Sequence, residues 1–168
     1  MDTQQRTEPS RIADERTSLT QFLDWQRQTL EMKVAGLTAE QLREKAVPPS
    51  AISLLGLVRH LAEVERSWFR VVVNGEQVPS YWGRGADGYH ADFEVEDADV
   101  EKAFEVWREA CAQSRAVVDG AESLDVLGRY GDEEYSLRYV LTHMIEEYAR
   151  HNGHADFLRE RLDGATGE

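Results

Sequence analysis

The sequence predicts an all-α protein in which four long helices form one bundle. Apolar residues recur at helical spacing in several long segments, and glycine, proline and serine mark the breaks between them. Strand-like alternation of apolar and polar residues is scarce. At 168 residues, of which 41% are hydrophobic, the chain is long enough to bury a sizeable core. We therefore expect residues 1–168 to form a single domain, with the polar residues 1–10 frayed.

Five segments carry helical periodicity or helix start signals. We expect a long helix over 12–34, a short helix after the capping box of Thr38 and Gln41, a second long helix over 53–73, a third that opens near Asp97 or Asp99, and a fourth over 136–162 that stops at Gly164. Residues 120–135 are expected to be a turn-rich connection.

The longest irregular connection spans residues 74–96. It is rich in glycine and carries Tyr81, Trp82 and Tyr89 as aromatic anchors. Long loops in compact domains are often functional, so this segment is a candidate wall for a binding site. Its composition does not indicate a ligand.

Composition excludes several classes of function. The 19 basic and 32 acidic residues leave a formal charge of −13, which argues against nucleic acid, because phosphate binding relies on a basic patch. No run approaches the roughly 18 apolar residues of a membrane span, and the polar N-terminus has no apolar signal core. Cys111 is the one cysteine, so no intrachain disulfide forms and a cytoplasmic location fits best. A small molecule is the expected partner.

The segment HMIEEYARHNGH, residues 143–154, holds three of the five histidines. Each helical residue advances about 100°, so with His143 at zero, His154 lies at about 20°, Glu147 at about 40° and His151 at about 80°. Apolar residues of the same helix occupy roughly 60° to 140°. Glu146 points away, at about 300°. Glu147 and His151 therefore lie on or beside the face that packs, and Glu146 lies in solvent.

A carboxylate on a packed face needs a hydrogen-bond network, a charge partner or a metal ion. Glu147 and His151 are one turn apart, so they form either an ordinary hydrogen-bonded pair or two ligands of one ion. His60, at the edge of the apolar stripe of the second helix, is the candidate third ligand. Two histidines and one carboxylate with open positions match several catalytic zinc and non-haem iron centres.

The remaining candidates have simpler readings. His143 and His154 lie at the rim of the stripe, where they contact the ligands or stay on the surface. Glu65 is interpreted as a salt-bridge partner and Cys111 as a small packing residue. The chain has no di-iron Glu-x-x-His pair, no H-E-x-x-H, no G-x-S-x-G and no C-x-x-C.

The pattern resembles a known superfamily. The histidine in SLLGLVRHLAEVERSWF, the Glu-x3-His pair in SLRYVLTHMIEEYARHNGHADFLRERLDGATGE and the segment FLDWQRQTL resemble the DinB/YfiT-like four-helix metalloproteins, which include mycothiol-dependent maleylpyruvate isomerase. The match is nearest to an actinobacterial DinB-like branch with no assigned substrate. By position, the resemblance places the metal ligands at His60, Glu147 and His151. It implies a divalent metal, often zinc or nickel, and frequently a homodimer.

Two functions follow as hypotheses. The first is a metal-dependent enzyme that activates a low-molecular-weight thiol such as mycothiol, or water, for S-transfer, isomerisation or hydrolysis of a small molecule. The alternative is a non-catalytic, stress-associated helical bundle that binds a metal or a ligand. In that case His154 or His143 would close the metal coordination in place of water.

The histidine ligands predict a pH dependence. Imidazole binds a metal through its neutral form, so protons compete with the metal as the pH falls through the range where histidine ordinarily titrates. We expect bound metal to be lost below roughly pH 6. Metal content after gel filtration at several pH values measures this loss, and stoichiometric metal at about pH 4.5 would argue against histidine ligation.

Overall fold

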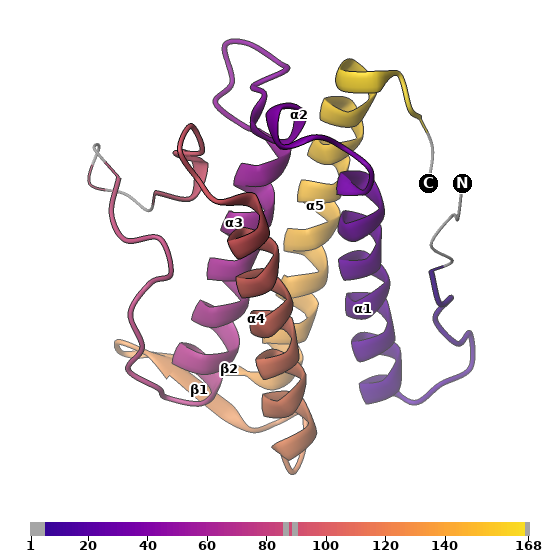
Figure 1. Ribbon diagram of the computed structural model, residues 1–168. Coiled ribbons are helices and arrows are strands. Elements are labelled where there is room, and N and C mark those ends of the chain that lie inside the picture. The colour runs from indigo at the N-terminus through magenta and orange to yellow at the C-terminus, as the bar shows by residue number, and fades with distance from the viewer. Residues whose placement is uncertain (1–5, 86–87, 89–90, 167–168) are drawn as a thin grey trace. The chain divides into compact units, whose positions relative to one another are not determined.

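The computed structural model describes residues 6–85, 88 and 91–166, and these residues are mostly helical (Figure 1). The elements in chain order are α1 (Glu15–Val34), α2 (Ala39–Arg43), α3 (Leu54–Glu65), the π-helix η1 (Arg66–Val73), the 3₁₀-helix η2 (Ala91–Phe93), α4 (Val100–Gly120), β1 (Leu127–Tyr130), β2 (Glu133–Ser136) and α5 (Leu137–Asp163). The all-α class is confirmed.

The chain packs as two compact units. The terminal unit comprises Met1–Leu54 and Leu141–Glu168, and the central unit comprises Leu55–Val140. The single domain expected from the chain length stays a prediction. Part of the long loop, including Tyr89 and His90, lies outside the described residues.

In the terminal unit, α1 lies beside α5 (Figure 1). Asn152, which is 5% exposed, donates to the backbone oxygen of Gln26 at 3.0 Å and to its side-chain oxygen at 2.8 Å. Arg159 donates to the carbonyls of Lys33 and Ala35 at 3.0 and 2.8 Å. The Arg159 bonds use an α5 side chain to satisfy carbonyls at the end of α1, which have no partner within the helix.

The expectation of a frayed N-terminus does not hold for residues 6–10. The Arg6 guanidinium donates to the Thr29 hydroxyl at 2.9 Å and lies 4.1 Å from the centre of the Trp25 ring. The backbone amide of Ser10 donates to Gln21 at 2.7 Å. The polar composition that suggests fraying here supplies hydrogen bonds to α1 instead. Residues 1–5 lie outside the described part of the chain.

Several predicted helix ends are confirmed. Thr38 and Gln41 form the reciprocal capping box, and Asp99 caps α4 by accepting from Lys102 N. Gly164 ends α5 with a φ of 76°, a conformation that glycine adopts without strain. The first helix starts three residues later than expected, at the Asp14 cap.

In the central unit, α3 continues into η1, so the second long helix is not α-helical throughout. Asn74 N bonds Phe69 O at 3.0 Å, the five-residue spacing of a π-helix. α4 packs beside this helix: the Cys111 thiol donates to Glu65 at 3.5 Å, and Arg70 donates to Gln113 at 3.2 Å.

The turn-rich connection expected across residues 120–135 also contains two strands that the sequence analysis did not predict, because β1 and β2 form an antiparallel hairpin (Figure 1). Tyr130 pairs with Glu133, which leaves Gly131 and Asp132 as a two-residue turn with Gly131 at φ 61°. Each strand has four residues and most are exposed, so the apolar alternation that predicts strands is missing. The Gly-Asp pair was the available signal.

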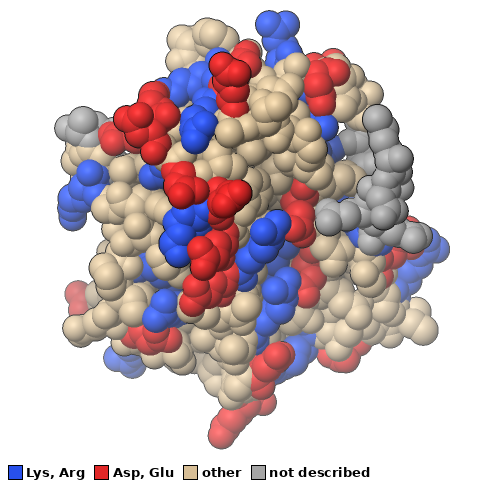
Figure 2. All heavy atoms as spheres, viewed as in Figure 1, with Lys and Arg blue, Asp and Glu red and all other residues tan. Residues whose placement is uncertain are grey.

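Charges of both signs are interspersed on the face of the molecule drawn in Figure 2. Among the described residues, no helix has the length and apolar character that a membrane span requires.

Gly128 is predicted to be indispensable to hairpin packing. A Cβ at this position would lie 2.3 Å from the backbone oxygen of Val72, so Gly128→Ala must displace either β1 or η1. We expect a loss of about 1–3 kcal/mol in the free energy of unfolding, measured by chemical denaturation. Gly153→Ala is the control, since a Cβ there meets nothing within 4 Å and the α5 interior should gain about 0.5–1 kcal/mol. Equal effects of the two changes would contradict this packing.

Candidate metal centre

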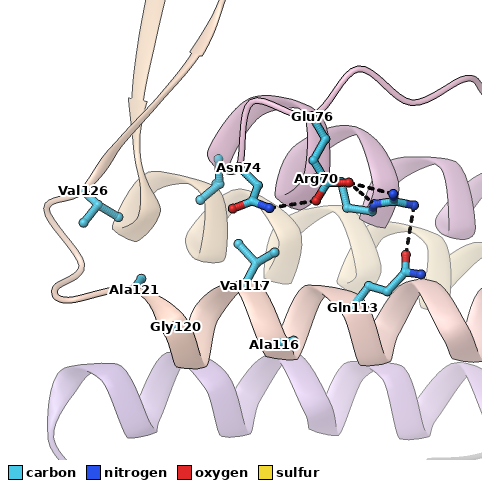
Figure 3. Close-up of a pocket in the computed structure, with 10 residues that line it drawn as sticks. Arg70, Asn74, Glu76, Gln113, Ala116, Val117, Gly120, Ala121 and Val126 are labelled. Carbon is cyan, nitrogen blue, oxygen red and sulfur yellow. Dashed lines mark hydrogen bonds and ion pairs between the residues drawn. The ribbon is translucent and has the colours of Figure 1, made fainter.

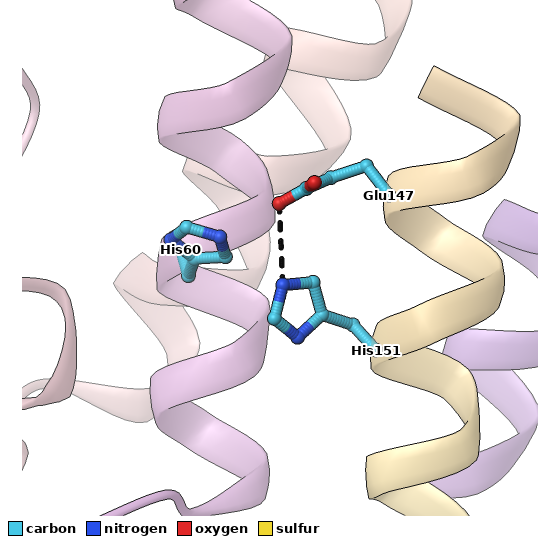
Figure 4. A group of neighbouring side chains, drawn as sticks. All are labelled: His60, Glu147 and His151. Carbon is cyan, nitrogen blue, oxygen red and sulfur yellow. Dashed lines mark hydrogen bonds and ion pairs between the residues drawn. The ribbon is translucent and has the colours of Figure 1, made fainter. Parts of the chain in front are cut away.

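The two adjacent glutamates of α5 lie in different surroundings. The side chains of Glu147 and His151 are 18% and 12% exposed, whereas those of Glu146 and Arg150 are 47% and 64% exposed. Glu146 accepts a hydrogen bond from Arg150 Nε at 2.9 Å in solvent. Glu147 Oε1 lies 3.2 Å from His151 Nε2 on the more buried face (Figure 4). The structure thus separates the two glutamates as the helical wheel predicts.

His154 contacts His151 at the ring nitrogen that does not face Glu147. His154 Nδ1 lies 3.3 Å from His151 Nδ1, so one of these nitrogens donates to the other. When His151 is the donor, its Nε2 lone pair faces the Glu147 carboxylate 3.2 Å away, and a cation between these electron-rich atoms would be stabilising. When His154 is the donor, His151 Nε2–H donates to Glu147 instead.

The two histidines at the rim of the stripe differ. The pKa of His154 is lowered, first by burial and then by His151 and Arg150, which favours the neutral ring that can accept from His151. His143 Nδ1 lies 4.0 Å from Glu146 Oε2, on the solvated side of α5. His154 therefore supports a candidate ligand, whereas His143 lies beside the exposed Glu146.

His60 on α3 is oriented by an aspartate that the sequence did not single out. Asp92 Oδ2 lies 3.1 Å from His60 Nδ1, and the Asp92 side chain is 6% exposed. Phe93 stacks on the imidazole, with ring centres 5.6 Å apart. A carboxylate that accepts the Nδ1 proton leaves the Nε2 lone pair of His60 to bind a metal. Asp92 was missed because spacing along one helix says nothing of a loop 32 residues away.

Arg59 holds the part of the loop that carries Asp92. Its guanidinium donates to the carbonyls of Ala91 and Glu94, both at 2.8 Å. It also lies 4.6 Å from the centre of the Trp82 ring, and Trp82 Nε1 donates to Arg59 O at 2.9 Å. Burial lowers the pKa of Arg59, while Asp92 and Glu94 oppose that shift. The two carbonyl bonds bracket Asp92 and fix the backbone on both sides of it.

Glu63 and Arg66 anchor the earlier part of the same loop. Glu63 is 4% exposed and accepts from the amides of Tyr81 and Trp82 and from Arg66 Nε. Arg66 donates in turn to Val78 O at 3.0 Å. Buried charged side chains of α3 and η1 therefore hold this part of the 74–96 loop in place through hydrogen bonds.

Each unit supplies donor atoms of a kind that a divalent cation accepts. The terminal unit supplies a carboxylate and an imidazole from Glu147 and His151, one turn apart on α5. The central unit supplies the imidazole of His60, held by Asp92. Nitrogen and carboxylate ligands of this kind fit zinc and its neighbours in the first transition row.

A separate cavity of about 510 Å³ lies in the central unit between η1 and α4 (Figure 3). Arg70 crosses its polar side, donating to Glu76 at 2.8 Å and to Gln113 at 3.2 Å, and Asn74 donates to Glu76 at 2.7 Å. Hydrogen bonds to Glu76 raise the pKa of Arg70 and lower that of Glu76. Since these polar groups form hydrogen bonds with one another, we interpret the cavity as a gap in the packing and not as a ligand site.

A family model described as mycothiol-S-transferase matches residues 18–164. Among curated proteins, none matches the chain.

Proposed function

Because the chain belongs to the mycothiol-S-transferase family, we propose that it is a divalent-metal-dependent enzyme acting with a mycothiol-like thiol on a small molecule. The observation that carries the proposal is the pair on α5: Glu147 and His151 share a face with ligand atoms 3.2 Å apart, while Glu146 points to solvent. S-transfer is the reaction that the family description favours, and isomerisation or hydrolysis are the other reactions open to such a centre.

We propose His60, Glu147 and His151 as the three metal ligands. Each offers one ligand atom of a type that divalent cations accept. A metal bound in this way would also stabilise the folded chain, since it binds the native state and not the unfolded one.

A bound divalent ion lowers the pKa of a thiol or water that it contacts, which supplies a nucleophile at neutral pH. The chain's own residues prepare the ligands for that role. Asp92 accepts a hydrogen bond from Nδ1–H of His60, which keeps the proton on that nitrogen. The Nδ1 of His154 lies where it can accept a hydrogen bond from Nδ1–H of His151. The chain's own thiol, Cys111, is 3% exposed and donates to Glu65, so the reacting thiol has to come from a cofactor.

Zinc or nickel as the metal, a homodimer and a cytoplasmic location complete the proposal. The family resemblance supports the first two, and the single cysteine supports the third. Exposed aromatic side chains at Phe22 and Phe157, 48% and 69% exposed, offer apolar surface for self-association. Light scattering that gives the monomer mass at all concentrations would reject the dimer.

The ligand assignment predicts that His60→Ala, Glu147→Ala and His151→Ala each abolish or severely weaken metal binding. Glu146→Ala is the matched control, and we expect it to retain full occupancy and to change stability by no more than about 0.5 kcal/mol. Elemental analysis and thermal unfolding with and without chelator, on protein without a histidine tag, measure both effects.

The same variants separate a metal site from a hydrogen-bonded pair. Without metal, Glu147→Ala should be neutral or stabilising, because it removes a largely buried carboxylate. Equal metal occupancy in Glu146→Ala and Glu147→Ala would overturn the site. Full metal binding with no turnover of any mycothiol conjugate would favour the non-catalytic alternative.

Asp92 is predicted to act through His60. Asp92→Ala should weaken metal binding by about 10–100-fold, because the imidazole loses the group that fixes its orientation and proton. Asp97→Ala, which changes an exposed acid between η2 and α4, is the control. Chelator competition measures the affinities, and an unchanged affinity in Asp92→Ala would contradict the role.

A further inference from the structure

The hairpin register gathers three side chains on the face of β1 and β2 that meets η1. Tyr130 pairs with Glu133, and Gly128 pairs with Tyr135. Directly paired residues, and residues two apart on one strand, point to the same side of a sheet. Tyr130, Glu133 and Tyr135 therefore share a face with Gly128, which touches the Val72 backbone.

A cavity of about 780 Å³ lies under this face, within the central unit. Its size is in the range of small-molecule sites. The walls are mainly apolar and aromatic, with charged groups at a few positions. The lining residues that carry the argument are Trp68, Val72, Val78, Tyr130, Glu133 and Tyr135.

The aromatic rings form part of a cage. Trp68 and Tyr135 meet edge to face, with ring centres 5.3 Å apart and an interplanar angle of 88°. Tyr130 is 66% exposed at the tip of the hairpin, so its ring can cover a bound molecule. Aromatic faces carry negative potential and attract cations. π-helices such as η1, which supplies Trp68, are frequent at functional sites.

Of the charged side chains that line the cavity, only the Glu133 carboxylate has no oppositely charged partner among the described residues. The Arg66 guanidinium is paired with Glu63, and Glu76 is paired with Arg70. Within the described residues, Glu133 has no cationic partner, and the Tyr135 hydroxyl donates a hydrogen bond to it. The cavity thus combines electron-rich rings with one uncompensated negative charge, on a chain of net charge −13.

We propose that this aromatic cavity binds an organic cation, such as a quaternary ammonium or amine on a small apolar body. Trp68, Tyr130 and Tyr135 would surround the cationic group and Glu133 would balance its charge. The site uses none of the proposed metal ligands and goes beyond the proposed transferase activity.

The test uses choline and its uncharged isostere 3,3-dimethyl-1-butanol, titrated into chelator-treated protein. Binding is followed by the NMR shifts of the Trp68 indole. We expect choline to bind the cavity and the isostere to bind more weakly. Glu133→Gln and Tyr130→Leu should each weaken choline binding by about two- to five-fold, since both groups are exposed at the rim.

Glu134→Gln is the matched control, because Glu134 is the adjacent carboxylate on the opposite face of β2, where it pairs with Arg129. Its affinity for choline should equal that of the unmodified chain. Glu147→Ala should also leave choline binding unchanged, which keeps this result separate from the fate of the metal centre. Equal binding of choline and the isostere would overturn the proposal, as would equal losses in Glu133→Gln and Glu134→Gln.

Discussion

The arrangement of the central unit depends on charged side chains that are buried on the continuous helix formed by α3 and η1. Arg59, Glu63 and Arg66 are 7%, 4% and 7% exposed, and a charge at such positions is unfavourable unless it is paired and hydrogen-bonded. The partners they find are backbone groups of the loop after η1 and, for Glu63 and Arg66, each other. The described part of that loop is held in place by these buried side chains of α3 and η1, because they need its backbone groups as hydrogen-bond partners.

The same constraint reaches the candidate metal centre. The loop carries Asp92 only one residue from a carbonyl that Arg59 holds, so the orientation of the carboxylate is inherited from the buried arginine. Asp92 in turn determines which nitrogen of His60 carries the proton. Removal of the charge at Arg59 would therefore act on His60 without touching it. This connection lies wholly within the central unit and needs no assumption about the metal itself.

Helical periodicity predicted the parts of the fold and of the site that depend on a single helix. The caps at Thr38 and Asp99, the stop at Gly164 and the separation of Glu147 from Glu146 all follow from local sequence. The role of Asp92, the hairpin and the π-helical register of η1 do not. The contacts of Asp92 with His60 and of Gly128 with Val72 join segments far apart in the chain, which helical spacing does not encode. For the hairpin, the Gly-Asp turn was the one local signal.

The change from α-helix to π-helix separates the candidate metal ligand His60 from the aromatic cavity along one continuous helix. His60 lies in the α-helical part, where regular spacing places it at the edge of the apolar stripe. Trp68 lies in the π-helical part, where the wider turn departs from that spacing and the hairpin packs against the helix. Because Gly128 has no side chain, the hairpin can approach the η1 backbone closely. The aromatic cavity takes walls from this π-helical segment and from the hairpin, and the helical wheel predicts neither of them.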